Sequence, residues 1–251
     1  MLTTSTEYVV RDWYRSAEGQ QIMSTIMNRN TQRRKVFGLL ERPSFPPQLH
    51  PDEFQYKIFV SGKSGVGKSS TIARLTANNV PKVHAETIGI ATSVVYWPAK
   101  IADINKVVMF QLQLWDAGET TIRKFHHILP ACKEKADAVM FLFSFTDKSS
   151  FSNVPQQMTK VLGPEDNKCK FIIGTKLDQH ARSEVTQQDV QTFESQWQLP
   201  IIPVKNLTDQ SDFRNDLQEV APLLNYICDQ LWKRDQILAG KMPPNQSYGQ
   251  I

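Results

Sequence analysis

The stretch that decides the fold is Gly62-Lys63-Ser64-Gly65-Val66-Gly67-Lys68-Ser69, which fits the pattern G-x-x-x-x-G-K-S/T. It comes directly after an apolar run at residues 56–60, typical of a strand, and before a helical pattern. The glycines let successive backbone N–H groups curl around a phosphate, and the helix N-terminus adds the positive end of its dipole. The stretch therefore predicts a phosphate-binding loop in an α/β fold.

The side chains of this loop have distinct expected tasks. We expect Lys68 to reach the β- and γ-phosphates as a catalytic residue, and the Ser69 hydroxyl to bind Mg²⁺. The residues expected to contact the nucleotide here are Gly62, Ser64, Gly65, Val66, Gly67, Lys68, Ser69 and Ser70.

Three segments further along the chain carry polar groups next to predicted strands. Thr87, in Glu86-Thr87-Ile88-Gly89, precedes an edge strand, where its hydroxyl could complete the Mg²⁺ shell. Asp116 ends another strand, where a carboxylate can hold the metal through water while Gly118 senses the γ-phosphate. In Thr175-Lys176-Leu177-Asp178, the Asp178 carboxylate can accept both N–H groups of a guanine edge, and the stem of Lys176 would lie along the base. Their order and placement at strand ends predict a site for a guanine nucleotide with Mg²⁺.

Short apolar runs alternate with helical patterns after residue 52, which predicts βαβ units and a parallel sheet covered on both faces. Residues 90–97 and 107–114 are expected to form a hairpin-linked pair at the sheet edge, separated by a turn near Pro98. Residues 138–145 and 171–173 are near-continuous apolar runs, as buried parallel strands are. Thr186 followed by Asp189 predicts the capped start of a helix, and the last helical pattern ends at Gly240.

A cluster of four prolines between Pro43 and Pro51 predicts a semi-rigid linker. We therefore expect an N-terminal extension at 1–52, a main domain at 53–240 and a C-terminal tail at 241–251. Ile22 and Ile26 are spaced for one helical face within the extension. This short helix either docks on its own domain or binds a partner or a membrane surface, and the sequence leaves both interpretations open.

Composition excludes several classes of protein. In a chain of 251 residues, 29 Lys and Arg against 25 Asp and Glu give a net charge of +4, too mild to predict a nucleic-acid partner. Three cysteines far apart in the sequence favour a reducing, cytoplasmic compartment. We expect no secretory leader and no direct lipid anchor, because residue 2 is leucine and the final residues contain no cysteine. Any membrane contact is then expected to come through partners.

Over residues 56–233 the chain resembles the Ras-superfamily small GTPases, on the strength of the phosphate loop, Glu86-Thr87-Ile88-Gly89, the aspartate at the end of the third strand and Thr175-Lys176-Leu177-Asp178. The resemblance implies a small G domain, with a mostly parallel six-stranded sheet flanked by helices and the nucleotide at the carboxyl ends of the strands. It implies GTP or GDP and Mg²⁺ as cofactors. It also implies that Lys205, in Pro203-Val204-Lys205, helps to close the base pocket.

Segments partly outside these motifs, at residues 34–43 and 94–100, are closely similar to a divergent branch of the superfamily, the Rem- and Rab-similar GTPases of the ciliogenesis and planar polarity effector complex. This resemblance implies Fuzzy, Inturned and Wdpcp as partners. It also implies a role at the basal body and cytoskeleton in primary cilium assembly, with targeted vesicle delivery, protein transport and exocytosis.

The second switch departs from the family pattern. The usual Asp-x-x-Gly-Gln is replaced by Asp116-Ala117-Gly118-Glu119, which is one residue short and lacks the glutamine that orients the attacking water. Glu119, at the catalytic position, would bring negative charge towards the γ-phosphate, so we expect slow hydrolysis.

A non-cycling interaction protein that keeps GTP as a structural ligand is the alternative. A metabolic phosphotransferase is a third possibility, against which residues 175–178 argue. The long connection at residues 97–106 is either a surface loop or a partner contact.

Overall fold

The computed structural model describes residues 7–27, 51–76, 78, 80–81, 86–125, 127–163, 166–206 and 213–242. Most of the predicted proline-rich linker and of the C-terminal tail lies outside these residues. Among the described residues, no helix combines the length and the apolar character that crossing a lipid bilayer requires.

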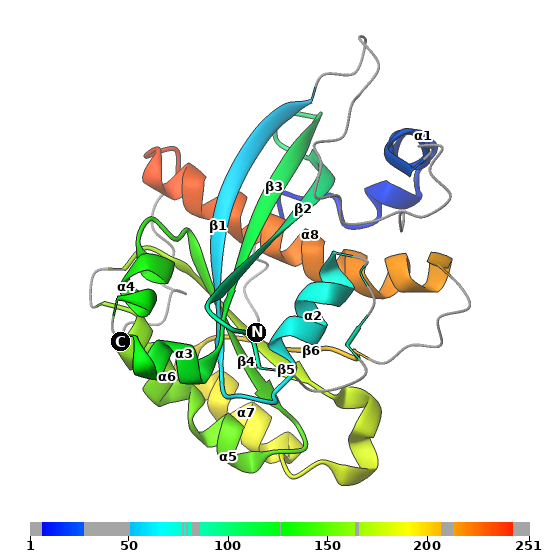
Figure 1. The fold of residues 1–251 in the computed structure, drawn as a ribbon. Helices are drawn as coiled ribbons and strands as arrows, with labels where there is room; N and C mark the ends of the chain where they lie inside the picture. Colours follow the sequence, from blue (N-terminus) through cyan, green and yellow to red (C-terminus); the bar gives the residue numbers. More distant parts are fainter. Residues whose placement is uncertain are drawn as a thin grey trace.

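A six-stranded sheet forms the centre of the molecule, in the spatial order β2-β3-β1-β4-β5-β6 (Figure 1). β2 pairs antiparallel with β3, and every other pair of neighbouring strands is parallel. The strands are β1 (Asp52–Gly62), β2 (Ile90–Ile101), β3 (Lys106–Ala117), β4 (Ala138–Ser144), β5 (Cys169–Thr175) and β6 (Ile201–Pro203). The predicted fold class, a mostly parallel six-stranded sheet with flanking helices, is confirmed.

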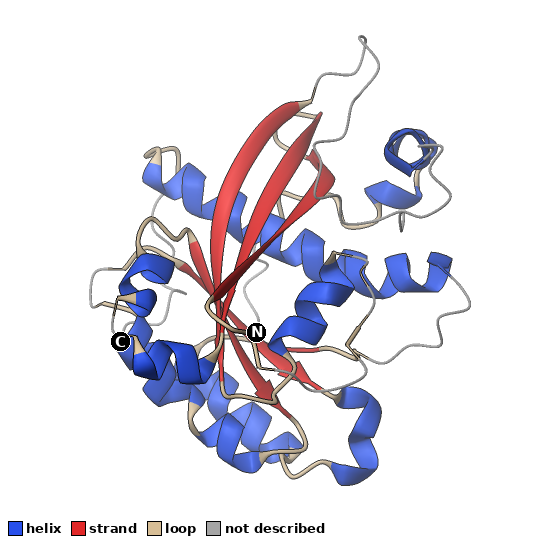
Figure 2. Cartoon of the chain, in the orientation of Figure 1, coloured by secondary structure: helices blue, strands red, loops and turns tan. Residues whose placement is uncertain are grey.

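Helices cover both faces of the sheet (Figure 2). Consecutive residues of β1 face opposite sides, because side chains alternate along a strand: Ile58 and Val60 belong to one core cluster and Phe59 to the other. The first cluster contains side chains of α1 (Ala17–Met27), α2 (Lys68–Leu75) and α8 (Phe213–Leu238). The second is covered by α3 (Glu119–Lys124), α4 (Ile128–Lys133), α5 (Lys148–Ser152), α6 (Val154–Val161) and α7 (Gln187–Trp197). Two 3-10 helices, η1 (Trp13–Arg15) and η2 (Leu177–Arg182), complete the described elements.

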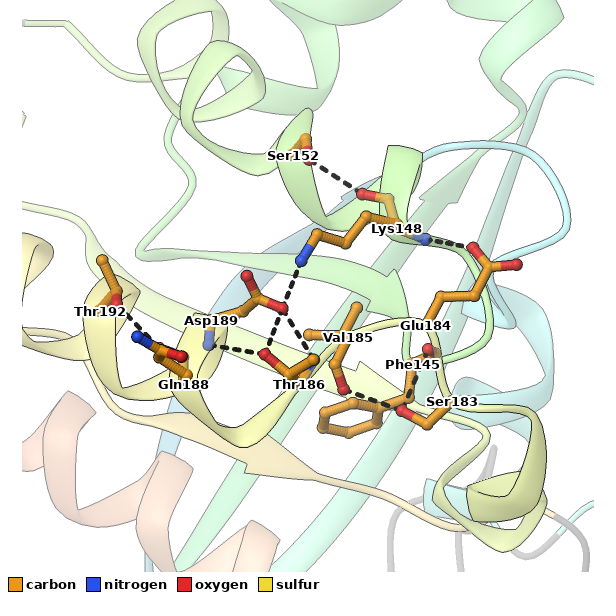
Figure 3. Close-up of polar contacts among 10 residues, drawn as sticks. All are labelled: Phe145, Lys148, Ser152, Ser183, Glu184, Val185, Thr186, Gln188, Asp189 and Thr192. Carbon is orange, nitrogen blue, oxygen red and sulfur yellow. Dashed lines mark hydrogen bonds and ion pairs between the residues drawn. The ribbon is translucent and has the colours of Figure 1, made fainter.

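The predicted cap of α7 is present. The Thr186 hydroxyl accepts from the backbone N–H of Asp189 at 3.2 Å, and the Asp189 carboxylate accepts from the backbone N–H of Thr186 at 2.8 Å. Figure 3 shows this reciprocal pair, with the amine of Lys148 directed at the same carboxylate.

The prediction of a turn near Pro98 is wrong. β2 continues through Pro98 to Ile101, and the chain reverses at residues 102–105 instead, where Asn105 has a φ of 48° and its N–H donates to the carbonyl of Ala102 at 3.2 Å. An edge strand tolerates proline, because one side of its backbone needs no strand partner. The region between the predicted strands is thus mostly strand, with an exposed turn at residues 102–105, and whether a partner binds that turn stays a prediction. It is a longer hairpin whose Trp97 and Ile101 are fully buried.

The N-terminal segment at residues 8–10 covers this end of the hairpin. The N–H of Val10 donates to the Lys100 carbonyl at 3.0 Å, and the N–H of Ala102 donates to the Tyr8 carbonyl at 2.8 Å. Farther along, Ile22 of α1 is buried and belongs to the same core cluster as side chains of α8. Of the two open interpretations, the structure therefore favours a helix docked on its own domain.

Candidate functional site

The predicted phosphate loop lies between β1 and α2, at the carboxyl end of the sheet. Gly65 and Gly67 have φ values of 77° and 101°, which other residues rarely adopt, so both positions favour glycine. The Lys68 amine donates to the carbonyls of Gly62 and Lys63, each at 2.8 Å, and so lies across the loop. Burial lowers the pKa of Lys68, and the carboxylates of Asp116, Glu119 and Glu86 oppose that shift.

Three oxygen-bearing side chains meet beside the first turn of α2. The Ser69 hydroxyl donates to Asp116 Oδ2 at 2.5 Å, the Thr87 hydroxyl donates to the same oxygen at 3.0 Å, and the two hydroxyl oxygens lie 3.1 Å apart. Asp116 is only 3% exposed, and its Oδ1 is buried without a hydrogen-bond partner among the described residues. A buried carboxylate oxygen left free beside two hydroxyls fits Mg²⁺, which prefers oxygen ligands. The sequence-predicted set Ser69, Thr87 and Asp116 thus lies together.

The two predicted switch segments contact each other closely. A side chain on Gly118 would place its Cβ 2.1 Å from the Thr87 carbonyl oxygen, so only glycine allows this approach. The Glu86 carboxylate accepts from the backbone N–H of Thr120 at 2.7 Å and from its hydroxyl at 2.8 Å. The segment around Thr87 is therefore in direct contact with the residues that follow β3.

Glu119 is the first residue of α3 and its side chain reaches the phosphate loop. Its Oε2 accepts a hydrogen bond from the backbone N–H of Ser64 at 2.8 Å. Its other oxygen pairs with Arg123, one turn later on the same helix. The residue at the expected catalytic position thus binds an N–H group of the loop that is predicted to hold phosphate.

The segment predicted to read the base follows β5. The Thr175 hydroxyl donates to the Val66 carbonyl and lies 3.0 Å from that of Phe143, which ties β5 to the phosphate loop. Lys176 has a φ of 58°, and Asp178 follows in the first turn of η2. Oδ1 of Asp178 is buried and has no hydrogen-bond partner in the described part of the chain. Such an unpaired acceptor fits the N–H donors of a guanine edge.

Lys205 follows β6, and its side chain is exposed. The next residue, Asn206, was missed by sequence reasoning. Its amide donates to the Thr71 hydroxyl on α2 at 3.0 Å and lies 3.2 Å from the Cβ position of Gly67. Asn206 is 6% exposed and links the base-side loop to the helix of the phosphate loop. Only its position after a short strand could have indicated it.

A sequence model of the Ras family matches residues 57–213. Ciliogenesis and planar polarity effector 2 of Xenopus laevis is 48% identical over 236 residues, which cover 91% of this chain and 94% of that protein. The Homo sapiens protein of the same name is 45% identical over 242 residues, covering 94% and 93%. Human Ras-related protein Rab-30 is 29% identical over 143 residues, covering 56% of this chain and 66% of Rab-30.

These matches confirm the resemblance that the motifs indicate, both to the superfamily and to its ciliogenesis and planar polarity branch. The family match runs from the middle of β1 to the first residue of α8, and so contains β2 to β6 and all the residues of the site. The chain belongs to the Ras family.

Proposed function

We propose that this protein is a GTP-binding molecular switch. The observation that carries the proposal is the meeting of Ser69, Thr87 and Asp116 beside the phosphate loop, with one buried oxygen of Asp116 unpaired. The free oxygen of Asp178 supports guanine over adenine, because a carboxylate accepts from the two N–H donors that guanine presents and adenine lacks.

Each residue has a separate task in the proposed switch. The loop backbone and Lys68 bind the phosphates, and Asp178 binds the base. Bound Mg²⁺ would neutralise charge on the β- and γ-phosphates, held on the protein side by Ser69, Thr87 and Asp116. Because Thr87 and Gly118 are in contact, occupation of this site orders both switch segments together, and their surface is what a partner would recognise.

We infer that hydrolysis is slow. Glu119 stands where a small GTPase usually has glutamine, and a carboxylate has no N–H with which to orient an attacking water. In this structure the carboxylate binds Ser64. A non-cycling protein that keeps GTP as a structural ligand is the second candidate, favoured by the same residue.

In the cell, we propose that the switch acts in primary cilium assembly at the basal body, together with Fuzzy, Inturned and Wdpcp, and in targeted vesicle trafficking and exocytosis. Relatives named as ciliogenesis and planar polarity effectors, which align with more than nine tenths of this chain, support the ciliary role. The named partners, the basal body and the trafficking role rest on the resemblance in sequence. Membrane contact is proposed to come through these partners.

The first test is the identity of the nucleotide that co-purifies with the Mg²⁺-loaded protein, followed by chromatography over hours at 25 °C. We expect the GTP that is bound to stay unhydrolysed over this period, whatever share of the protein carries GDP. GDP that accumulates at the rate of an ordinary small GTPase would contradict slow hydrolysis, and an adenine nucleotide would contradict the switch itself.

The second test concerns partners. Lys68→Ala and Ser69→Asn remove a phosphate contact and a metal ligand, so both should abolish co-purification with Fuzzy and Inturned. Ser152→Asn, at an exposed position of α5, is the matched control and should leave co-purification intact. Undiminished capture by both site variants would refute a nucleotide-controlled switch.

A further inference from the structure

The contact between Glu119 and the phosphate loop is unusual among the described contacts of the site. A side-chain carboxylate accepts a hydrogen bond from a backbone N–H of a loop that is expected to bind phosphate. The Ser64 N–H is one of the backbone donors that the loop motif provides, and it donates to Glu119 Oε2 at 2.8 Å. A backbone N–H has one hydrogen. While Glu119 accepts it, that donor is not available to another acceptor.

Interactions within α3 hold the Glu119 carboxylate in place. Glu119 is the N-terminal residue of α3, a position that favours an acidic side chain, and it pairs with Arg123 at the i+4 position. The Glu119 side chain is 24% exposed, against 70% for Arg123, so the carboxylate is the more enclosed partner. This burial leaves its charge less screened by solvent than that of a surface residue.

We propose that Glu119 is the residue that sets the preference between GTP and GDP, as a latch that binds the phosphate loop through Ser64 and disfavours the triphosphate. This inference rests on the proposed function and deepens it. A third phosphate bound by this loop would add negative charge near the Glu119 carboxylate, which lies against the loop, and like charges repel more strongly in a partly buried site. The diphosphate lacks this group and leaves the latch closed.

The structure provides space into which the latch can open. A cavity of about 520 Å³ lies beside α3 and α6, and its lining includes Gly62, Glu119, Ile122, Arg123 and Gln157. Because Glu119 and Arg123 both line this cavity, the open latch would place the Glu119 carboxylate there. The start of α3 would stay tied to the segment around Thr87, because the backbone N–H and hydroxyl of Thr120 donate to Glu86.

The test measures dissociation constants of GDP and of a non-hydrolysable GTP analogue with Mg²⁺, for wild type, Glu119→Gln and Glu184→Gln. The analogue separates binding from hydrolysis, which Glu119→Gln also alters. Glu119→Gln should shift the ratio of the two constants about tenfold towards the triphosphate, because it removes one like charge at nearly constant shape.

Glu184→Gln is the matched control. Glu184 is an exposed carboxylate that shares an open surface hollow with Lys63 and Arg123, but its carboxylate accepts from the backbone N–H of Lys148, as Figure 3 shows, not from the loop. Its removal should change the ratio by less than about twofold, since exposed charges are screened.

A second readout follows the latch directly. The backbone amide resonance of Ser64 in the GDP-bound protein should shift in Glu119→Gln and stay in place in Glu184→Gln. An unchanged ratio in Glu119→Gln, with both nucleotides still bound, would overturn the latch alone. An equal shift of the ratio in Glu184→Gln would also overturn it, because net charge would then explain the effect. Failure of the wild type to bind either nucleotide would overturn the proposed function and the latch with it.

Discussion

The two ends of the central sheet are built by different means. At the carboxyl end of β1, β3 and β5, polar side chains from short loops meet around the phosphate loop, and buried oxygens of Asp116 and Asp178 remain unpaired. At the opposite end, the β2–β3 hairpin extends to residues 102–105 and is covered by the N-terminal segment and α8 (Figure 1). There two polar side chains are satisfied within the protein: Trp97 Nε1 donates to Asn225, and Asn225 donates to the Arg11 carbonyl. Trp232 Nε1, whose ring packs on Phe110, is buried without a partner among the described residues.

Because of this difference, ligand binding depends mainly on one end of the sheet and the stability of the fold mainly on the other. Unpaired acceptors in the binding end cost free energy until a ligand satisfies them, whereas satisfied groups in the hairpin end stabilise the fold at once. We therefore expect substitutions at the hairpin end to lower stability without changing nucleotide preference. Substitutions at the binding end should alter nucleotide binding and cost less stability.

The largest stability effect is expected from Trp97→Ala. Trp97 is fully buried between the N-terminal segment and α8, and its indole nitrogen donates to Asn225 at 2.8 Å. Truncation of a buried tryptophan costs about 3–5 kcal/mol. Chemical denaturation at saturating GDP should show this loss, while the ratio of GTP to GDP affinity stays at the wild-type value.

Trp97→Phe is the control for this prediction, because it keeps an aromatic ring and removes the donor to Asn225. Its cost should be clearly smaller than that of alanine. A changed nucleotide preference in either variant would mean that the two ends of the sheet are coupled.

A smaller loss is expected from Asp229→Ala. Asp229 Oδ1 accepts from the backbone N–H groups of Tyr8 at 2.7 Å and Val9 at 3.0 Å, so alanine leaves two buried donors unpaired. Hydrogen bonds to a charged acceptor contribute about 1.5–3 kcal/mol, and the free energy of unfolding should fall by about that amount. Amide hydrogen exchange at residues 8–10 should rise with it.

Asp103→Asn is the matched control for Asp229→Ala, since Asp103 is exposed in the hairpin turn. It should alter stability by less than about 0.5 kcal/mol. Unchanged hydrogen exchange at residues 8–10 in Asp229→Ala would show that the strand contact with β2 alone holds the segment.

At the binding end, Thr175→Val tests the link between β5 and the phosphate loop. Valine keeps the shape of this fully buried side chain but leaves the Val66 carbonyl without the hydroxyl donor. Stability should fall by only about 1–2 kcal/mol, while guanine nucleotide should dissociate measurably faster. Thr159→Val, on the outer face of α6, removes an exposed hydroxyl and should leave dissociation unchanged. Equal dissociation rates in all three proteins would exclude Thr175 as a support of the loop.

The sequence predicts the binding end of the sheet better than the hairpin end, because the residues that define the binding end lie in short continuous segments. The phosphate loop is contained in eight consecutive residues, and the aspartates at 116 and 178 follow strands that the apolar runs indicate. Parallel strands bring such residues to one edge, so Ser69, Thr87 and Asp116 are expected together and lie together. Their roles in binding stay predictions.

The hairpin end depends on contacts that no local pattern contains. Tyr8 and Asp229 are 221 residues apart in the sequence, and the hydrogen bond between them gives no periodic signal. Pro98 indicates a turn by its own preference, but pairing with β3 along the whole edge overrides that preference. Asn206 and the bond from Ser64 to Glu119 were missed for the same reason: each depends on a loop conformation set by tertiary packing.

The smallest effect is expected at the cap of α7, which lies near the binding end but takes no part in the proposed site. The Lys148 amine and the backbone and hydroxyl of Thr186 bind the Asp189 carboxylate and lower its pKa to about 2, with the Lys148 hydrogen bond the largest cause. Its folded pKa is thus below the unfolded value of about 3.9, so the stabilisation is fully present above about pH 5 and is lost as pH falls towards 2. The difference in unfolding free energy between wild type and Asp189→Asn should therefore be constant near neutrality and shrink below pH 4.

A difference that persists at pH 2 would assign the effect to the capping geometry alone. A change in nucleotide preference in Asp189→Asn would show that other charges at this end of the sheet act on the site, and not only the charge of Glu119.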